Sequence, residues 1–261
     1  MSNTNLNPDS NQLDPEQPSA SEPPQGTRTV QTSLFRSAPL TFGIIGITVL
    51  VYILQMASLS FFGVDYPQAL FLKYNELILQ GELWRLITPI LIHASILHIG
   101  MNMYALLILG PVVERTYGKL RFLELYLMAG LLGNTFSFFF TQEPSLGAST
   151  AIFGLISAQA VYIYRNRVYY GKQARPMLMN ILFIILLNVL IGFIPGIDYW
   201  GHLGGLLGGL IFAWGAGPVF ESVESPYGYS LAERNRTSPH TIFLAETILV
   251  AVLVLIKFIH G

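Results

Sequence analysis

Two short motifs that lie far apart in the chain carry residue types suited to nucleophilic catalysis. Ser149 lies in the segment LGASTAIFG (146–154), and His202 lies in the segment GHLGG (201–205). A serine hydroxyl is a weak nucleophile until a neighbouring base takes its proton, and imidazole suits that task because it titrates near neutral pH. The two motifs therefore predict a serine hydrolase with a Ser149/His202 dyad. The alternative is that glycine-rich helices simply pack here, with His202 as a hydrogen-bonded histidine of their interface.

Small residues around both motifs favour close contact between the helices that carry them. Gly205 and Gly209 follow His202 on one side of a helix, and the segment of Ser149 has small residues of its own: Ala148, Ala151 and Gly154. Small residues at such spacings let two backbones approach closely. We therefore expect these two helices to pair, which would bring a short serine side chain within reach of the histidine.

Two neighbouring residues bear on how the dyad is completed. Asp198 precedes His202 by four residues, but we expect it to be a solvated charge of a loop, so a dyad rather than a triad is predicted. Phe153 follows Ser149 by one helical turn. It is expected either to pack against the His202 ring and orient it, or to be an ordinary core aromatic.

A third polar group, in the segment HASILHIGMN (93–102), is a candidate oxyanion-binding site. His98 and Asn102 are four residues apart and so share a helical face. Acyl transfer develops negative charge on the carbonyl oxygen, and donors aimed at that oxygen supply much of the catalysis. The expected donors are the His98 ring, the Asn102 amide and the Ser149 backbone N–H. Interhelical hydrogen bonding is one alternative, and a metal site formed by His93, His98 and His202 is another. The five-residue spacing of His93 and His98 and the lack of a nearby carboxylate base argue against the metal site.

The composition is that of a membrane protein. Of the 261 residues, 52% are hydrophobic and only 11% are charged, and the mean hydropathy is +0.52, so much of the apolar surface must face lipid. The net charge of −1 argues against binding to nucleic acid. The chain has no cysteine, which excludes disulfides and a cysteine nucleophile.

The apolar stretches predict an all-α fold, a polytopic membrane helical bundle of seven spans. We expect the spans at 41–62, 89–111, 120–140, 149–164, 177–195, 200–217 and 241–259. The domains expected are a disordered cytoplasmic tail at 1–38, a six-helix core at 39–218, a cytoplasmic linker at 219–240 and an additional C-terminal transmembrane helix at 241–261. In the loop between the first two spans, Arg85 is expected to satisfy loop carbonyls.

The distribution of basic residues predicts the orientation. With a cytoplasmic N-terminus, eleven of the fourteen Lys and Arg residues lie on the inner side, and only Lys73, Arg85 and Lys257 lie outside. Ser149 then lies in the outer leaflet with the other candidate groups. About 16 residues separate it from Arg165, or roughly 24 Å of helix, against a hydrocarbon core of ~30 Å. We expect an integral protein of a bacterial plasma membrane, with a buried active site that opens to the non-cytoplasmic side.

Together these motifs resemble those of the rhomboid family of intramembrane serine proteases. The likeness covers about residues 40–217, and its pieces are Gly147-x-Ser149, His202-x-x-Gly205-x-x-x-Gly209, His93-x4-His98-x3-Asn102 and Trp84-Arg85. The resemblance implies that Ser149 and His202 form the dyad, that His98, Asn102 and the Ser149 amide bind the oxyanion, and that Gly147 and Phe153 support the site. It also implies no cofactor and no metal, and substrates that are single-pass transmembrane proteins cleaved in or near their membrane segment.

Two residues depart from the pattern of the family. Thr150 stands where the family commonly has glycine, and is expected to tighten the site and alter rate or specificity. Phe153 stands where the family often has tyrosine, and keeps the ring without the hydroxyl. Neither change removes a catalytic group.

The predicted function is therefore intramembrane serine endopeptidase. The main alternative is a catalytically inactive rhomboid-like protein that binds transmembrane helices; such relatives usually lack the serine or the histidine, and this chain has both. A transporter or channel is less well supported, because the spans have no clear inverted repeat and few buried charges.

Overall fold

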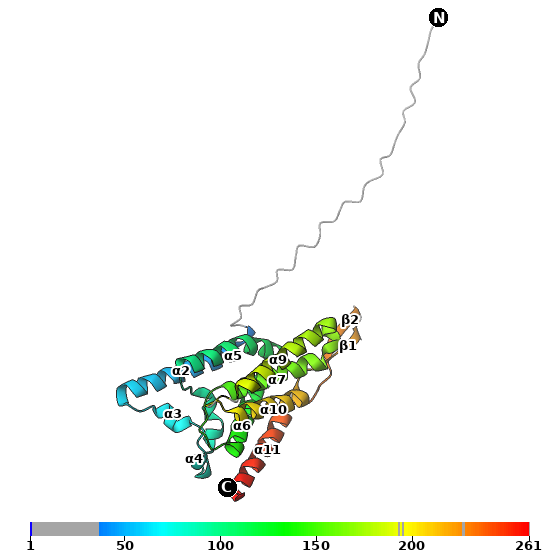
Figure 1. Ribbon diagram of the computed structural model, residues 1–261. Coiled ribbons are helices and arrows are strands. Elements are labelled where there is room, and N and C mark those ends of the chain that lie inside the picture. Colours follow the sequence, from blue (N-terminus) through cyan, green and yellow to red (C-terminus); the bar gives the residue numbers. More distant parts are fainter. Residues whose placement is uncertain (2–36, 193, 195, 226–227, 261) are drawn as a thin grey trace. The chain divides into compact units, whose positions relative to one another are not determined.

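A computed structural model describes residue 1 and residues 37–192, 194, 196–225 and 228–260. The tail predicted at 1–38 lies almost entirely outside the described residues. The fold is a helical membrane bundle, as the apolar pattern predicts. Figure 1 shows its long helices: α2 (Pro39–Phe62), α5 (Ile96–Tyr117), α6 (Lys119–Phe140), α7 (Ser149–Arg165), α9 (Ala174–Ile191), α10 (Tyr199–Ala216) and α11 (Pro239–His260).

Five segments of the described chain are long and apolar enough to cross a bilayer: Pro39–Phe62, Ile96–Tyr117, Lys119–Phe140, Arg167–Ile191 and Pro239–Ile259. The other two predicted spans are the shorter helices α7 and α10, with 17 and 18 residues. Most residues of α7 are buried, and α10 packs most extensively against α6 and α7. The two short helices α7 and α10 therefore lie in the interior of the bundle, among the longer helices. The protein is an integral membrane protein.

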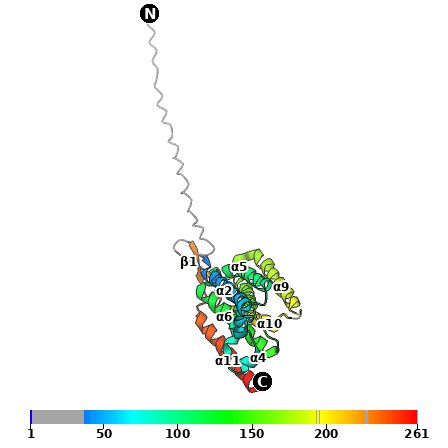
Figure 2. The same ribbon diagram turned by 90° about the vertical axis from the view of Figure 1, so that its left-hand side faces the viewer.

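The periphery of the bundle is formed by α9 and α11, which lie on opposite sides of it (Figure 2). α11 packs against α6 and α10, whereas α9 packs mainly against α7. α9 follows a short connection made of α8 (Arg167–Tyr170) and the 3-10 helix η3 (Gly171–Gln173). Because it has few protein neighbours, α9 leaves most of its surface to lipid.

The second span begins at Ile96, so the start predicted at residue 89 is wrong. Thr88–Leu91 forms the 3-10 helix η2 instead, and the backbone is extended at Ile92. The helix proper starts where the Ser95 side chain accepts a hydrogen bond from His98 N at 3.2 Å, which is an N-cap. Ile90 and Ile92 are buried against the protein rather than facing lipid. The fifth span is likewise shifted from 177–195 to 174–191, with Gly192 at its C-terminus.

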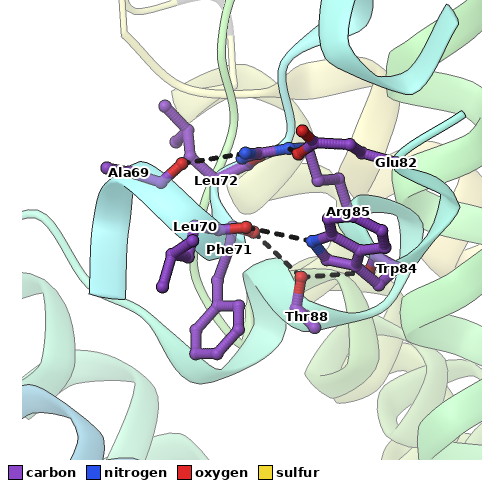
Figure 3. A network of polar contacts seen from close by, with 8 residues as sticks. All are labelled: Ala69, Leu70, Phe71, Leu72, Glu82, Trp84, Arg85 and Thr88. Carbon is purple, nitrogen blue, oxygen red and sulfur yellow. Dashed lines mark hydrogen bonds and ion pairs between the residues drawn. The ribbon is translucent and has the colours of Figure 1, made fainter. Parts of the chain in front are cut away.

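The loop between α2 and α5 is held together by hydrogen bonds to its carbonyl groups. It contains α3 (Tyr66–Phe71), α4 (Asn75–Leu79), the 3-10 helix η1 (Leu83–Leu86) and η2. The buried Arg85 guanidinium donates to Leu72 O at 2.8 Å and to Ala69 O at 2.9 Å, and it pairs with Glu82 at 2.6 Å (Figure 3). The expectation that Arg85 satisfies loop carbonyls is confirmed.

Lys73 joins the same loop to the segment that precedes α7. Its backbone forms an antiparallel bridge with Ser145, with N–O distances of 3.0 and 3.2 Å. Its ammonium group donates to Thr141 O and Glu143 O at 3.2 and 2.9 Å. Burial lowers the pKa of Lys73 to about 8 despite the opposing effect of nearby acidic residues. The loop and the start of the Ser149 helix are therefore one connected unit.

Buried polar groups fasten α2 at both ends. Near its start, the Glu114 carboxylate of α5 accepts hydrogen bonds from Leu40 N, Thr41 N and Thr41 Oγ1 at 3.0, 2.7 and 2.8 Å. These are backbone N–H groups that a helix N-terminus leaves without intrahelical partners. Toward the other end, the Gln55 amide bonds to both the N–H and the C=O of His93, at 3.0 and 3.2 Å.

The segment predicted as a plain linker at 219–240 contains a β-hairpin of β1 (Phe220–Ser225) and β2 (Gly228–Glu233). Asn166, just after α7, accepts from Phe220 N at 2.8 Å and donates to Pro218 O at 3.0 Å. Arg121 of α6 pairs with Glu233 at 2.7 Å. The polar strands are thus fixed to the bundle by side chains outside the hairpin, which a local sequence pattern does not reveal.

Candidate active site

Ser149 and His202 lie within hydrogen-bond distance of each other. Ser149 is the first residue of α7, and His202 lies in the first turn of α10. The distance from Ser149 Oγ to His202 Nε2 is 2.9 Å. When Nε2 carries no proton, the hydroxyl donates to it, which is the arrangement that a general base requires.

Backbone contact between α7 and α10 makes this short distance possible. A Cβ placed on Gly205 would lie only 2.9 Å from Thr150 C and 3.1 Å from Thr150 Cα. A Cβ on Gly209 would lie 2.5 Å from Ser157 Oγ and would also overlap the backbone of Gly154. Since these positions leave no room for a side chain, the small residues act as the sequence pattern predicts.

Asp198 is not the solvated loop charge that the sequence predicts. It is the N-cap of α10: its side chain accepts from Gly201 N at 2.8 Å, and its backbone carbonyl accepts from His202 N at 3.1 Å. The His202 Nδ1 atom has no hydrogen-bond partner among the described residues. Asp198 therefore positions the helix that carries His202, but it does not extend the pair to a triad.

The Phe153 ring stacks on the His202 ring. The ring centroids are 4.3 Å apart and the planes are inclined by 19°. Phe153 is buried, one turn along α7 from Ser149. The packing restrains the rotation of the imidazole, a task that a carboxylate hydrogen bond performs in triads.

His98 and Asn102 lie against Gly147, two residues before Ser149. Gly147 has a φ of +116°, a conformation that favours glycine. A Cβ there would lie 2.7 Å from His98 Nε2 and 3.7 Å from Asn102 Nδ2. Glycine thus satisfies a backbone and a packing requirement at once, and it leaves the His98 and Asn102 side chains beside the segment that enters α7.

His93 contributes a contact that the sequence did not indicate. Its Nε2 accepts from Ala148 N at 3.4 Å, directly before Ser149. Burial, with the neighbouring His98, lowers the pKa of His93 to about 3, so the ring is neutral and able to accept. Gln55 holds the backbone of His93. In the sequence, the signal that could have revealed this contact is the polar residue Gln55 within an otherwise apolar span.

Thr150, the departure from the family pattern, packs against α6. Its side chain lies against Gly133 of α6, where an added Cβ would be 2.7 Å from Thr150 Cβ. Its hydroxyl is buried without a hydrogen-bond partner among the described residues. The extra volume of Thr150 is accommodated by a glycine of the neighbouring helix.

A cavity of about 880 Å³ joins these groups between α5, α7 and α9. Its lining includes the predicted site residues Ser149, His202, His98, Asn102 and Phe153. Within the described part of the chain, no three His, Cys, Asp or Glu side chains are grouped so as to hold a metal ion. The arrangement is compatible with acyl transfer: a hydroxyl beside an imidazole, with the side chains of His98 and Asn102 lining the same cavity.

Comparison with known proteins identifies the family. The model of the rhomboid domain matches residues 80–218. Over 189 residues the chain is 39% identical to "Rhomboid protease GluP" of Bacillus subtilis (strain 168), which covers 71% of this chain and 37% of that protein. Over 153 residues it is 39% identical to "Rhomboid-like protease 1" of Toxoplasma gondii, with coverages of 57% and 49%.

A plant relative is similar over the same region. "RHOMBOID-like protein 9, chloroplastic" of Arabidopsis thaliana is 32% identical over 190 residues, which cover 70% of this chain and 44% of that protein. The chain thus spans less than half the length of each of these three relatives. The matched rhomboid domain nevertheless makes up more than half of the chain. With its motifs and its helical bundle, this chain belongs to the rhomboid family.

Proposed function

We propose that this protein is an intramembrane serine endopeptidase that cleaves peptide bonds in or near the transmembrane segments of single-pass membrane proteins. The observation that carries the proposal is the 2.9 Å distance between Ser149 Oγ and His202 Nε2 in a membrane-embedded cavity. Two relatives whose names include "protease" support it. Both members of the dyad are present, which disfavours an inactive helix-binding protein.

In the proposed mechanism, Ser149 Oγ attacks the carbonyl carbon of the scissile peptide bond while His202 Nε2 takes its proton. The tetrahedral intermediate carries an oxyanion, which His98, Asn102 and the Ser149 backbone N–H stabilise by hydrogen bonds. His202 then returns the proton to the leaving amine, and an acyl-serine remains. Water, activated by His202, hydrolyses this ester and regenerates the hydroxyl.

The proposed topology has a cytoplasmic N-terminus and a cavity that opens to the opposite side of the membrane. It is supported by the asymmetric distribution of Lys and Arg. The starts of α5, α7 and α10 carry the reactive groups that line one cavity. This shared cavity supports the proposed topology, in which alternation of the spans puts the three helix starts in one leaflet.

Cleavage of a model substrate by the purified protein tests the proposal. The substrate is a single-pass protein with small residues near the outer end of its membrane segment. Wild type should cleave it, and Ser149→Ala and His202→Ala should not. Cleavage at full rate by Ser149→Ala would refute the dyad. A wild-type protein that retains the substrate without cleaving it, and that no fluorophosphonate labels, would instead support an inactive helix-binding protein.

A further inference from the structure

The cavity extends along α7 well beyond the dyad. Its lining includes Gln159 as well as Ser149. The two residues are about three turns apart on one helix, which corresponds to ~15 Å at ~1.5 Å per residue. One end of the cavity therefore holds the reactive groups, and the other lies deep in the membrane.

Toward its deep end the cavity is lined mainly by apolar side chains, with Gln159 and Tyr104 as the polar exceptions. Its lining there includes Ile108 of α5, Ile156 of α7 and Ile181 of α9. Ile108 is as far along α5 from His98 as Gln159 is along α7 from Ser149. Ile181 is similarly far from Ile191, the end of α9 that faces the dyad. An amide group in such surroundings is costly unless it is hydrogen-bonded.

Gln159 lacks that hydrogen bond within the protein. Its Oε1 atom is buried and has no partner among the described residues. By contrast, Asn188 of α9, another amide of the lining, donates to Ile184 O of its own helix at 2.8 Å. The carboxamide of Gln159 carries both an acceptor and two donors. The Oε1 atom is buried in the wall, but the terminal amide torsion of glutamine is soft, so a turn of the amide can present its oxygen or its nitrogen to a neutral polar side chain that enters the cavity.

From this arrangement we infer that Gln159 is a polar subsite for a hydrogen-bonding side chain in the transmembrane segment of the substrate, namely Ser, Thr, Asn or Gln. The inference rests on the proposed function, because it takes the occupant of the cavity to be the segment whose scissile bond lies at Ser149. At ~15 Å from Ser149, the recognised residue lies about ten positions from that bond in a helical segment. In an extended segment it lies about five positions away.

A charged residue does not fit this subsite. The surrounding isoleucines provide no counter-ion, and the polar residues along this part of the lining, Gln159 and Tyr104, include no Asp, Glu, Lys or Arg. Ionised side chains at membrane depth are costly without a partner. Substrates selected by Gln159 therefore have a neutral polar residue within an otherwise apolar membrane segment.

The test compares two kinds of substrate that share one cleavage site. One has an all-leucine membrane segment beyond the site, and the others have a single Asn placed at successive positions from about five to about ten residues away. For wild type, kcat/KM should be higher for the Asn substrate at one position, by about 3- to 30-fold, as for interhelical hydrogen bonds in membranes. In Gln159→Leu this ratio should fall to about one.

Two controls separate recognition from damage to the fold. Gln159→Met, which keeps the length of the side chain without its amide, should lose the ratio as Gln159→Leu does. Asn188→Leu should keep it, because the Asn188 amide is already bonded within α9. Equal kcat/KM for both substrates in wild type, or a preference that survives in both Gln159 variants, would overturn the inference. Failure of wild type to cleave any substrate would refute the proposed function instead.

Discussion

The contact between α7 and α10 makes Gly205→Ala a sharp test of how the dyad is positioned. A Cβ at this position would overlap the Thr150 carbonyl oxygen and lie 2.9 Å from Thr150 C. Carbon atoms reach their optimal separation at about 3.5–4.0 Å. The obstacle is backbone within a helix, so it cannot rotate away as a side chain can. The two helices must therefore move apart by about 1 Å or tilt.

This displacement should lower both the stability of the protein and its rate of cleavage. Overpacking of this kind costs about 1–3 kcal/mol of stability. Gly205 lies one turn from His202, so a separation of ~1 Å lengthens the 2.9 Å bond to Ser149 to about 3.9 Å. That distance is too long for a hydrogen bond. A misplacement of ~1 Å in an active site reduces the rate by about 100-fold.

The assay measures cleavage of the transmembrane substrate, the rate of fluorophosphonate labelling and the temperature of unfolding. Gly46→Ala is the matched control, because a Cβ there meets nothing within 4 Å. We expect Gly205→Ala to reduce cleavage and labelling together and to unfold at lower temperature, with Gly46→Ala unchanged. A Gly205→Ala protein that unfolds earlier but is labelled at the wild-type rate would show that the close approach does not position the dyad.

Three further perturbations follow from the structure. Removing the stacked ring in Phe153→Ala should lower kcat by about 2- to 10-fold, and Phe153→Tyr should restore most of it; equal rates for both variants would contradict the orienting role. Arg85→Lys, which cannot keep two carbonyl bonds and the Glu82 pair at once, should lower the free energy of unfolding by about 1.5–3 kcal/mol, measured by chemical denaturation against wild type. Burial lowers the pKa of Lys73 from 10.5 to about 8 in the folded protein. Below pH 8 the buried ammonium is charged and lowers the stability of the folded state by its full amount. Between pH 8 and 10.5 the folded state loses this proton before the unfolded state does, so the destabilisation disappears. The free energy of unfolding of wild type should therefore rise across that range, by up to about 1.4 kcal/mol per pH unit relative to Lys73→Met. Parallel pH profiles of the two proteins would contradict the lowered pKa of Lys73.

The sequence predicted the long helices and the proximity of Ser149 and His202 more reliably than it predicted the segments between spans. Apolar length locates a membrane helix because the backbone must satisfy its own hydrogen bonds in lipid. The start of α5 was misplaced because the apolar residues Ile90 and Ile92 are buried against protein, which looks the same in sequence as burial in lipid. Asp198 was misassigned because a helix cap depends on where the helix begins.

Long-range polar contacts were the hardest to anticipate. The contact between His93 and Ala148 N and that between Gln55 and the His93 backbone each join segments far apart in the chain. The first depends on how α5 packs against α7 and the second on how α2 packs against α5, and no local pattern encodes either. The glycines of α10 were easier to interpret, because their spacing alone predicts a helix face without side chains, where another helix can pack closely.

The two buried polar contacts of α2 make the length of this helix part of the geometry of the site. Thr41 and Gln55 are fully buried, while most of the helix between them is exposed to the bilayer. They are separated by about 21 Å along the axis at ~1.5 Å per residue. One residue is held by the far end of α5 and the other by His93, so the length of α2 sets the depth at which His93 meets Ala148. Apolar substitutions along α2 leave that depth unchanged, whereas a single inserted residue shifts one of the two contacts by ~1.5 Å and turns it by about 100°.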